Sequence, residues 1–429
     1  NPAHYCADPG TQPLGDHALD RIAGTFADHL EARVVGAAMW SADGRPQEVG
    51  GIVWADGQVW NHGRNAPPEH GFALAYERQC DTVSGCALAI RKELWQQLEG
   101  FDPRYRPAYA EDTDLCLRVR QAGHSVWVQP AARVLHLEGL SHSRSTEQGL
   151  KAHQVRNLEQ LKQQWQHTLD TQQPPAGHPW LLAADRSLLG RPLALLLQPT
   201  TEAINSCRQQ GYGVLVLGES PQEDVLGLPL GWRDLERWLL EQLPECGPEV
   251  VLVGSLEGAA GELAQRLQQA RSEWALVAKP TELLLKVEAM QLPALPGWDR
   301  QELRILASSS GLHTDGWLET PSRLVIQLLG EGAIAGGLRL GLYLPEQGLQ
   351  RDDPTVLIQL DVEKPISQVL KPGLNTVVVQ RPKPSARSTV VIQISSAPLV
   401  QPANPSDQRR LMAVLAELEL LQQHCQGFT

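Results

Sequence analysis

Three acidic residues lie within four positions in the sequence AEDTDLCLRVRQAG (residues 110–123). The apolar residues that follow recur with the spacing of one helix face, so Glu111, Asp112 and Asp114 fall in the first turn of a predicted helix. Unpaired N–H groups and the helix dipole favour negative charge at such a position. A carboxylate there can accept a proton from a reacting hydroxyl group, or it can serve only to stabilise the end of the helix.

The predicted helix is followed by short strands and a histidine. Arg118 and Arg120 fall in its later turns, and Gly123 is suited to a left-handed C-terminal cap. The sequence HSVWV is typical of a β-strand, and we expect Pro130 to end it. The next apolar stretch, ARVLH, ends at His136.

A turn of small residues precedes the acids. Ser84, Gly85 and Cys86 form this turn, and an apolar strand and an amphipathic helix follow it. The chain then enters the loop GFDPRYRPAY (residues 100–109), which leads directly to the acids. Glycine allows a backbone to approach a ligand closely, but a plain tight turn before a strand explains this glycine equally well.

In this order, the motifs resemble the C-terminal half of the catalytic domain of family 2 glycosyltransferases, which have the GT-A fold. Residues 81–141 resemble that region almost throughout, with Cys86 for the usual alanine, Glu99 for a glycine and Pro103 for a glutamate. The resemblance covers roughly residues 10–165. Several linked motifs in one order are more specific than any single motif.

The resemblance implies that Asp112 is the catalytic base of an inverting sugar transfer, with Glu111 beside it on the acceptor side. The base takes a proton from the acceptor hydroxyl as that hydroxyl attacks the anomeric carbon of a nucleotide sugar. Successive helical residues point in different directions, so the two acids can serve different partners. Asp114 and Arg118 are four positions apart and are interpreted as a structural pair.

The resemblance also implies a divalent cation, Mn²⁺ or Mg²⁺, that neutralises the departing diphosphate as a Lewis acid. His136 occupies the place of a metal-ligating histidine, and Asp8 is taken as the remnant of the metal-binding acids. The histidine can equally be a structural residue. We expect the first, nucleotide-binding half of the family's catalytic domain to be missing, so that this chain, which opens NPAHYC, is a truncated fragment not active on its own.

Two sets of residues are assigned to substrates by the same resemblance. Ser84, Gly85 and Cys86 would line the pocket of the donor sugar or the acceptor. Tyr105 and Tyr109, in the loop before the acids, could stack on a sugar ring. Aromatic residues are as often packing residues, and this alternative stays open.

The composition restricts the class of protein. The 429 residues are 42% hydrophobic and 20% charged, as in soluble globular proteins. A net charge of −12 argues against nucleic acid as a partner. The seven scattered cysteines favour reduced thiols in the cytoplasm. No apolar run approaches the roughly 20 residues of a transmembrane helix, so any membrane association is expected to be peripheral, at the inner face of the cell membrane.

The pattern of predicted elements indicates a multidomain α/β chain. Residues 1–170 form the partial GT-A-type domain, and the proline-rich residues 171–180 form a linker. Alternating strands and helices predict a Rossmann-like parallel domain over 181–296. Alternating strands predict an antiparallel β-sandwich over 297–403, and residues 404–429 are expected to form an amphipathic C-terminal helix.

The predicted function is therefore metal-dependent hexosyl or deoxyhexosyl transfer in cell-envelope polysaccharide biosynthesis. The substrates would be a nucleotide-sugar donor and a polysaccharide or lipid-linked glycan acceptor. The alternative is a non-catalytic glycan-binding or assembly scaffold, in which the acids only stabilise the helix end.

Overall fold

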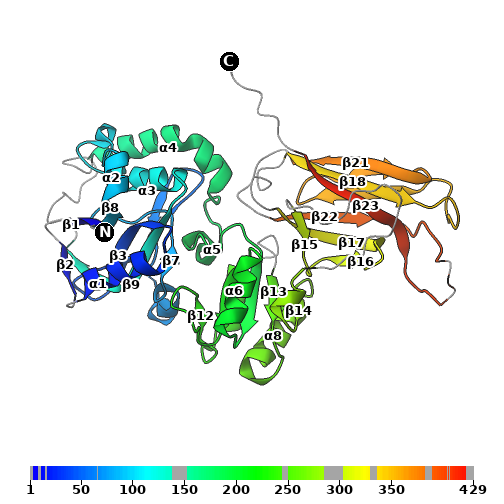
Figure 1. The fold of residues 1–429 in the computed structure, drawn as a ribbon, viewed down its shortest axis with the longest axis horizontal. Helices are drawn as coiled ribbons and strands as arrows, with labels where there is room; N and C mark the ends of the chain where they lie inside the picture. The colour runs from blue at the N-terminus through cyan, green and yellow to red at the C-terminus, as the bar shows by residue number, and fades with distance from the viewer. Residues whose placement is uncertain are drawn as a thin grey trace, which may run out of the picture. The chain divides into compact units, whose positions relative to one another are not determined.

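The computed structural model describes residues 3–7, 11–14, 17–64, 66–137, 152–243, 250–284, 303–328, 336–381, 389–402, 404 and 406–421. It is a mixed α/β protein with several sheets, as predicted, and its residue contacts divide it into two compact units. A mixed sheet, a parallel sheet and an antiparallel sheet follow one another along the chain (Figure 1). None of the described helices is both long enough and apolar enough to cross a membrane.

The mixed sheet has strands β3 (Ala32–Trp40) and β9 (Ser125–His136) at its centre. These two strands run parallel within the order β1–β8–β3–β9–β2, and the short strands β4 and β7 pair with β3 and β9. A separate hairpin joins β5 to β6. The remaining strands of this part are β1 (Ala3–Ala7), β2 (Thr11–Pro13), β4 (Pro46–Glu48), β5 (Gly51–Val53), β6 (Val59–Asn61), β7 (Arg78–Gln79) and β8 (Ala87–Arg91).

Helices cover both faces of the mixed sheet because its central strands are apolar on both sides. Val35 of β3 packs with Ile22 and Phe26 of helix α1, whereas Val34 packs with Leu115 on the opposite face. Side chains alternate across a strand, so one strand contributes to two cores. Figure 1 shows α1 on one side of the sheet and α2 and α3 on the other. The helices are α1 (Ala18–Asp28), α2 (Lys92–Gln97) and α3 (Glu111–Gln121), with the short 3-10 helices η1 (Pro68–Leu74) and η2 (Pro103–Tyr105).

The predicted helix with acids in its first turn is confirmed as α3. It begins at Glu111, and the glycine after it, Gly123, has a φ of 81°, as expected for a left-handed cap. The strand that follows does not end at Pro130, which corrects the prediction. The pairing of β9 with β3 is interrupted between Gln129 and Arg133 and then resumes to His136. A bulge at this place removes the need for the N–H group that proline lacks.

The predicted linker, residues 171–180, is packed against the first part of the chain. Helix α4 (Ala152–Gln172) ends within it, and the next residue, Gln173, is buried. The Gln173 side-chain Nε2 donates to the carbonyl oxygen of Val53 at 2.9 Å. This proline-rich stretch is therefore a packed connection and not a freely moving spacer.

An aromatic cluster follows the connection. Trp180 begins the short helix α5 (Trp180–Ala184), and its ring lies 5.8 Å from the ring of Trp238. Trp238 also lies 5.7 Å from Trp232, and His70 of η1 lies 5.3 Å from Trp232. These ring contacts account for three of the tryptophans as packing residues.

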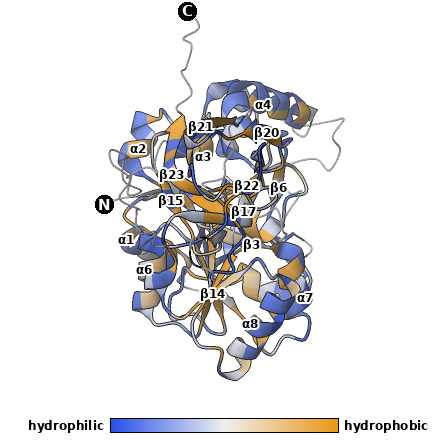
Figure 2. Cartoon of the chain, turned by 90° about the vertical axis from the view of Figure 1, so that its right-hand side faces the viewer, coloured by the Kyte–Doolittle hydropathy of each residue, from blue (hydrophilic) through white to orange (hydrophobic). Residues whose placement is uncertain are grey.

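The parallel sheet has the strand order β12–β11–β10–β13–β14. Its parallel pairs include β10 with β13, β11 with β12, and β13 with β14, which agrees with the predicted alternation of strands and helices. Figure 2 shows hydrophobic strands beside helices that carry hydrophilic residues, such as α7. The elements are β10 (Leu193–Leu197), α6 (Thr201–Gln209), β11 (Gly213–Leu217), β12 (Gly227–Leu228), α7 (Leu235–Gln242), β13 (Val250–Val253), α8 (Gly258–Ala270), β14 (Ala275–Val277) and η3 (Pro280–Glu282).

The antiparallel sheet surrounds one apolar core. Its order is β20–β19–β22–β17–β23–β18–β21, and β15 and β16 also pair with β17. Strands β19 and β21 are distant in this order but contact each other, so the sheet folds over its core. Its strands are β15 (Leu303–Ile305), β16 (Ser310–Leu312), β17 (Trp317–Leu328), β18 (Gly337–Leu344), β19 (Thr355–Leu360), β20 (Ile366–Val369), β21 (Gly373–Gln380), β22 (Thr389–Ser395) and β23 (Leu411–Leu421).

The expected helix over residues 404–429 is wrong, because residues 411–421 form strand β23. This strand lies between β17 and β18 and pairs antiparallel with both. Its leucines, alanines and glutamates have high helix propensity, but Met412, Val414 and Leu415 are all buried. Hydrogen bonding of β23 to a strand on each side and burial of its side chains outweigh its helix propensity, which amounts to about a few tenths of a kcal/mol per residue.

Two glycines let the side chains of Val83 and Thr82 pack closely against the backbone beside the small-residue turn. A Cβ added to Gly36 of β3 would overlap the side chain of Val83, and one added to Gly51 would lie 2.6 Å from Cγ2 of Thr82. The two residues that precede Ser84 are thus held against two glycines. Any larger residue at these glycines would displace the turn.

We predict opposite effects for the same substitution at two glycines. Gly36→Ala should lower the free energy of unfolding by about 1–3 kcal/mol because it overpacks the sheet. Gly24→Ala, in helix α1, meets open space within 4 Å and should raise that free energy by up to about 1 kcal/mol. Urea unfolding followed by tryptophan fluorescence measures both, and equal effects of the two variants would contradict the close approach.

Candidate functional site

The start of helix α3 is held by an unusual backbone path. Tyr109 and Ala110 both have positive φ values, 79° and 72°, which side chains other than glycine adopt at a cost of about 1–3 kcal/mol. The buried amide of Asn157 fixes this path, because its Nδ2 donates to the carbonyl oxygens of Tyr105 (2.6 Å) and Ala108 (2.8 Å). Helix α4 therefore holds the turn from which the acids of α3 project.

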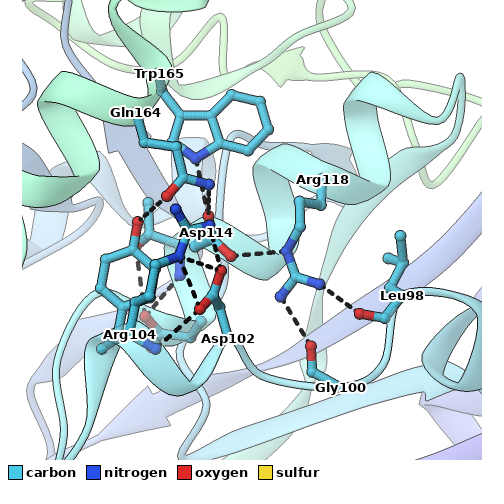
Figure 3. A network of polar contacts seen from close by, with 11 residues as sticks. Leu98, Gly100, Asp102, Arg104, Asp114, Arg118, Gln164 and Trp165 are labelled. Atoms are coloured by element: carbon cyan, nitrogen blue, oxygen red, sulfur yellow. Dashed lines mark hydrogen bonds and ion pairs between the residues drawn. The ribbon is translucent and has the colours of Figure 1, made fainter.

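Asp114 anchors the first turn of α3, as Figure 3 shows. This carboxylate is fully buried, and its Oδ2 accepts from Nε of Arg118 at 2.7 Å. Its Oδ1 accepts from Gln164 (3.0 Å) and Trp165 (2.9 Å), both on α4. The interpretation of Asp114 and Arg118 as a structural pair agrees with these contacts.

Arg118 extends the same network to the loop before the acids. Its guanidinium donates to the carbonyl oxygens of Leu98 (2.7 Å) and Gly100 (2.8 Å). The loop GFDPRYRPAY begins at this glycine, so one ion pair connects α3, α4 and the end of α2 (Figure 3). A buried ion pair that also satisfies backbone carbonyls fixes geometry more than it adds stability.

The structure brings Asp112 and the small-residue turn together. Oδ2 of Asp112 accepts a hydrogen bond from the backbone N–H of Gly85 at 2.9 Å, and Oδ1 accepts from the N–H of Thr113 at 2.7 Å. Asp112, Ser84, Gly85 and Cys86 are all half-buried. A Cβ on Gly85 would make ordinary van der Waals contact with Asp112, 3.5 Å from its Cβ and 3.7 Å from its Oδ2, so the backbone of the turn lies directly beside this carboxylate.

Glu48 is a member of the site that the sequence analysis missed. It lies on β4, is 7% exposed, and its Oε1 accepts from the backbone N–H of Ser84 at 2.9 Å. Burial, and next the negative charge of Asp112, raise the pKa of Glu48 to about 8, while the Ser84 N–H and the charge of Arg64 oppose this rise. A glutamate protonated at neutral pH therefore lies beside the predicted base.

Glu111 has a similar electrostatic environment. Burial, and next the negative charge of Asp112, raise its pKa to about 7. Its Oε2 is buried and has no hydrogen-bond partner among the residues that the structure describes. An acid of this pKa exchanges its proton readily at neutral pH, which suits a group beside an acceptor hydroxyl.

His136 and Cys86 also lie together. The His136 ring nitrogen Nδ1 is 2.9 Å from Oε1 of Gln47, and Nε2 is 3.7 Å from the Cys86 sulfur. Gln47 also donates from Nε2 to the His136 carbonyl oxygen at 3.0 Å. Gln47 thus orients the imidazole, much as an outer-shell partner orients a metal ligand.

The described residues do not form a cation site by themselves. Within the described ranges, no group of three or more histidine, cysteine, aspartate or glutamate side chains is arranged to hold a metal ion. Of the two predicted ligands, His136 is placed as above, and Asp8 lies outside the described residues.

The two tyrosines differ in position. Tyr105 is 1% exposed, and its hydroxyl donates to Oε1 of Gln164 at 3.0 Å. Its ring packs with Leu161 and Trp165 of α4, so the assignment of Tyr105 to sugar stacking is wrong and it is a packing residue. Tyr109 is half-buried and lies two positions before the first residue of α3.

Comparisons with known proteins agree with this arrangement. Residues 68–158 match the family model described as glycosyltransferase like family 2. The matched residues include the small-residue turn, α3 and His136. This segment is therefore similar to family 2 glycosyltransferases, as its motifs predicted.

Individual relatives match shorter portions. The uncharacterized protein y4gI of Sinorhizobium fredii (strain NBRC 101917 / NGR234) is 31% identical over 136 residues, 30% of this chain and 15% of that protein. The N-acetylglucosaminyl-diphospho-decaprenol L-rhamnosyltransferase of Mycobacterium tuberculosis (strain ATCC 25618 / H37Rv) is 42% identical over 78 residues, 18% of this chain and 25% of that enzyme. The chain therefore spans a quarter or less of the length of these curated relatives.

Among solved structures, the crystal structure of GalNAc-T7 with UDP, GalNAc and Mn²⁺ is similar to part of the chain. The identity is 14% and the TM-score is 0.28, over 38% of this chain and 31% of that chain.

We predict that Asp114→Ala lowers the free energy of unfolding by about 3–5 kcal/mol, because it leaves the charge of Arg118 without its buried partner. Arg104→Ala is the control, because it breaks the Asp102–Arg104 pair, whose arginine side chain is 54% exposed, and should cost at most about 1 kcal/mol. Thermal unfolding followed by the fluorescence of Trp165 and the other tryptophans measures the difference. Similar losses in both variants would refute the anchoring role of Asp114.

Proposed function

We propose that the intact protein is an inverting glycosyltransferase that moves a hexosyl or deoxyhexosyl group from a nucleotide sugar to a glycan acceptor. The observation that carries the proposal is the position of Asp112. Its carboxylate is half-buried and is fixed by the N–H groups of Gly85 and Thr113, and the residue beside it, Gly85, has no side chain to cover it. These properties are the ones that a positioned general base requires.

In the proposed reaction, the acceptor hydroxyl lies beside Oδ2 of Asp112. The hydroxyl oxygen attacks the anomeric carbon as its proton passes to this carboxylate, and the bond to the diphosphate oxygen breaks on the opposite face. The two backbone hydrogen bonds keep the carboxylate in one rotamer, so little orientation is lost on approach to the transition state. Glu111, whose pKa is raised to about 7, lies next to Asp112 on the proposed acceptor side.

The donor and the acceptor are proposed from similarity. The rhamnosyltransferase relative is named for transfer to a lipid-linked N-acetylglucosaminyl diphosphate, which supports a deoxyhexosyl donor and a lipid-linked or polysaccharide acceptor for this protein. Such acceptors are made at the cell envelope, so we propose a cytoplasmic site of action with peripheral association at the inner face of the membrane. No nucleic acid partner is proposed.

A divalent cation, Mn²⁺ or Mg²⁺, belongs to the proposal through the family resemblance alone. When bound, it would supply charge neutralisation of the departing diphosphate. His136 is the described side chain that we assign to it, with its ring oriented by Gln47.

The later parts of the chain are proposed to be accessory modules. The parallel sheet, with its first strand in the middle and later strands on both sides, supports a Rossmann-like domain. The folded antiparallel sheet supports a β-sandwich module, now with β23 as one of its strands. We propose that both assist assembly or acceptor binding, while the chemistry stays with the first part.

We predict that Asp112→Asn in the full-length protein lowers kcat by at least about 100-fold, because a general base contributes about 10²–10⁴-fold. The amide still accepts from the Gly85 N–H, so folding and nucleoside diphosphate binding should stay nearly unchanged. Asp20→Asn, at a side chain that is 81% exposed, is the control for the same chemical change. Sugar transfer and calorimetric binding of the diphosphate are the measurements.

Turnover of Asp112→Asn at the wild-type rate would refute the base assignment. If the wild-type protein binds glycans but transfers no sugar from any nucleotide donor, the protein is instead a glycan-binding or assembly scaffold.

We predict that His136→Ala weakens Mn²⁺ binding by at least about tenfold, the scale on which metal-site side chains act. Electron paramagnetic resonance of free Mn²⁺ measures the binding directly. His17→Ala, at a side chain that is 79% exposed, is the control. An identical Mn²⁺ titration in wild type and His136→Ala would make His136 a structural residue held by Gln47.

A further inference from the structure

Two carboxyl groups from distant parts of the chain hold neighbouring N–H groups of one turn. Glu48 accepts from the N–H of Ser84, and Asp112 accepts from the N–H of Gly85, each at 2.9 Å. The first acid lies on β4 and the second on α3. The two consecutive peptide units on either side of Ser84 are thus each held by one carboxyl group, and the position of the Asp112 carboxylate depends on the second of them.

The local structure of β4 explains how Glu48 reaches the turn. Met39 of β3 pairs with Glu48, whereas Trp40 pairs with Pro46, so Gln47 is the extra residue of a β-bulge. Bulges re-aim side chains next to functional sites. Here the two consecutive buried residues reach two site residues: Gln47 contacts His136 and Glu48 contacts Ser84.

We propose that Glu48 is a positioning residue of the transfer site, which holds the Ser84 N–H so that the Gly85 N–H is presented to the Asp112 carboxylate. This inference rests on the proposed function, because Asp112 is the base in that proposal. Glu48 itself touches the backbone of the turn and is not assigned any contact with substrate.

The charge state of Glu48 gives the inference a second consequence. The groups that face it are Asp112 on α3, Arg64 after β6 and Cys80 after β7. With its pKa raised to about 8, Glu48 is protonated below that pH, and Asp112 then provides the only negative charge of this facing set. As the pH rises through about 8, Glu48 ionises and a further negative charge develops beside Asp112, in addition to that of Glu111, whose pKa is about 7.

The direction of the pH effect follows from this order. The arrangement with neutral Glu48 is present below about pH 8 and is lost above it. Repulsion between the two carboxylates then disturbs the turn that both of them hold. Cys80 does not titrate in this window, because burial raises the pKa of its thiol well above the usual value, and the charge of Arg64 reduces the effect without changing its sign.

The test compares Glu48→Gln and Glu48→Ala with wild type in the full-length protein. Glutamine keeps an oxygen that accepts from the Ser84 N–H but cannot ionise, whereas alanine removes the acceptor. Glu93→Gln and Glu93→Ala, at an exposed position of α2, are the matched controls. The measurements are hydrogen exchange of the Ser84 and Gly85 amides, kcat and KM at pH 7, and kcat from pH 6 to 10.

We expect Glu48→Ala to speed exchange of both amides about tenfold or more and to lower kcat about tenfold or more, with a smaller change in KM for the donor. The kcat of Glu48→Gln should stay within about threefold of the wild-type kcat at pH 7, because one neutral hydrogen-bond acceptor replaces another. It should also lack the fall in kcat that wild type shows above about pH 8. If Glu48 only stabilised the fold, the fall in kcat above about pH 8 would be the same in Glu48→Gln and in wild type.

Unchanged amide exchange in Glu48→Ala would overturn the inference, as would an alkaline limb that is the same in Glu48→Gln and wild type. If Glu48→Ala does not fold, the pH profile of Glu48→Gln still decides. If wild type transfers no sugar at all, the proposed function fails, while exchange of the Ser84 and Gly85 amides that is faster in Glu48→Ala than in Glu48→Gln still supports the positioning role, and equal exchange in the two variants overturns it.

Discussion

The buried carboxylate of Asp114 is the constraint on which the rest of the site depends. Its oxygens accept from α3 and α4 at once, and its partner Arg118 holds the carbonyl groups that end α2. A carboxylate without access to water must have all its hydrogen bonds satisfied within the protein. These contacts fix the first turn of α3 in one position. Asp112 lies in the same turn, so its position is set by the contacts of Asp114.

The acids near this turn have different environments, although they are chemically similar. Asp114 is buried and paired with an arginine, so it fixes geometry. Glu48 and Glu111 are largely buried, and the charge of Asp112 adds to the rise in their pKa values. Asp112 is half-buried and bonded to backbone N–H groups. Environments that separate the proton affinities of neighbouring carboxyl groups are characteristic of sites that move protons.

The amino-acid sequence predicted the parts of the site whose signal is local. Helix α3 follows from its apolar spacing, and the linked order of the turn, the acids and His136 indicated the family. Glu48 could not be found in this way, because its partner is a backbone N–H group 36 positions away and a single acid in a short strand has no periodicity.

Tertiary packing also decided the two elements that were predicted wrongly. Pro130 lacks an N–H group, but the neighbouring strand tolerates a bulge there. The side chains of β23 favour a helix, but their position between two other strands decides the outcome. The sequence left Tyr105 either to stack on a sugar or to pack in the core, and its ring packs against Leu161 and Trp165 of α4. In each case the contact that determines the structure is made with residues far away in the sequence, which a pattern of neighbouring residues cannot reveal.

The central place of β23 has a consequence for biosynthesis. Strands β17 and β18 follow each other along the chain, but β23 separates them in the sheet. While the polypeptide is still emerging from the ribosome, these two edges have no partner between them and can pair with each other or with a second nascent chain. The antiparallel unit can therefore reach its native arrangement only after residue 421 has been synthesised, so we expect it to fold later than the mixed sheet that precedes it in the chain.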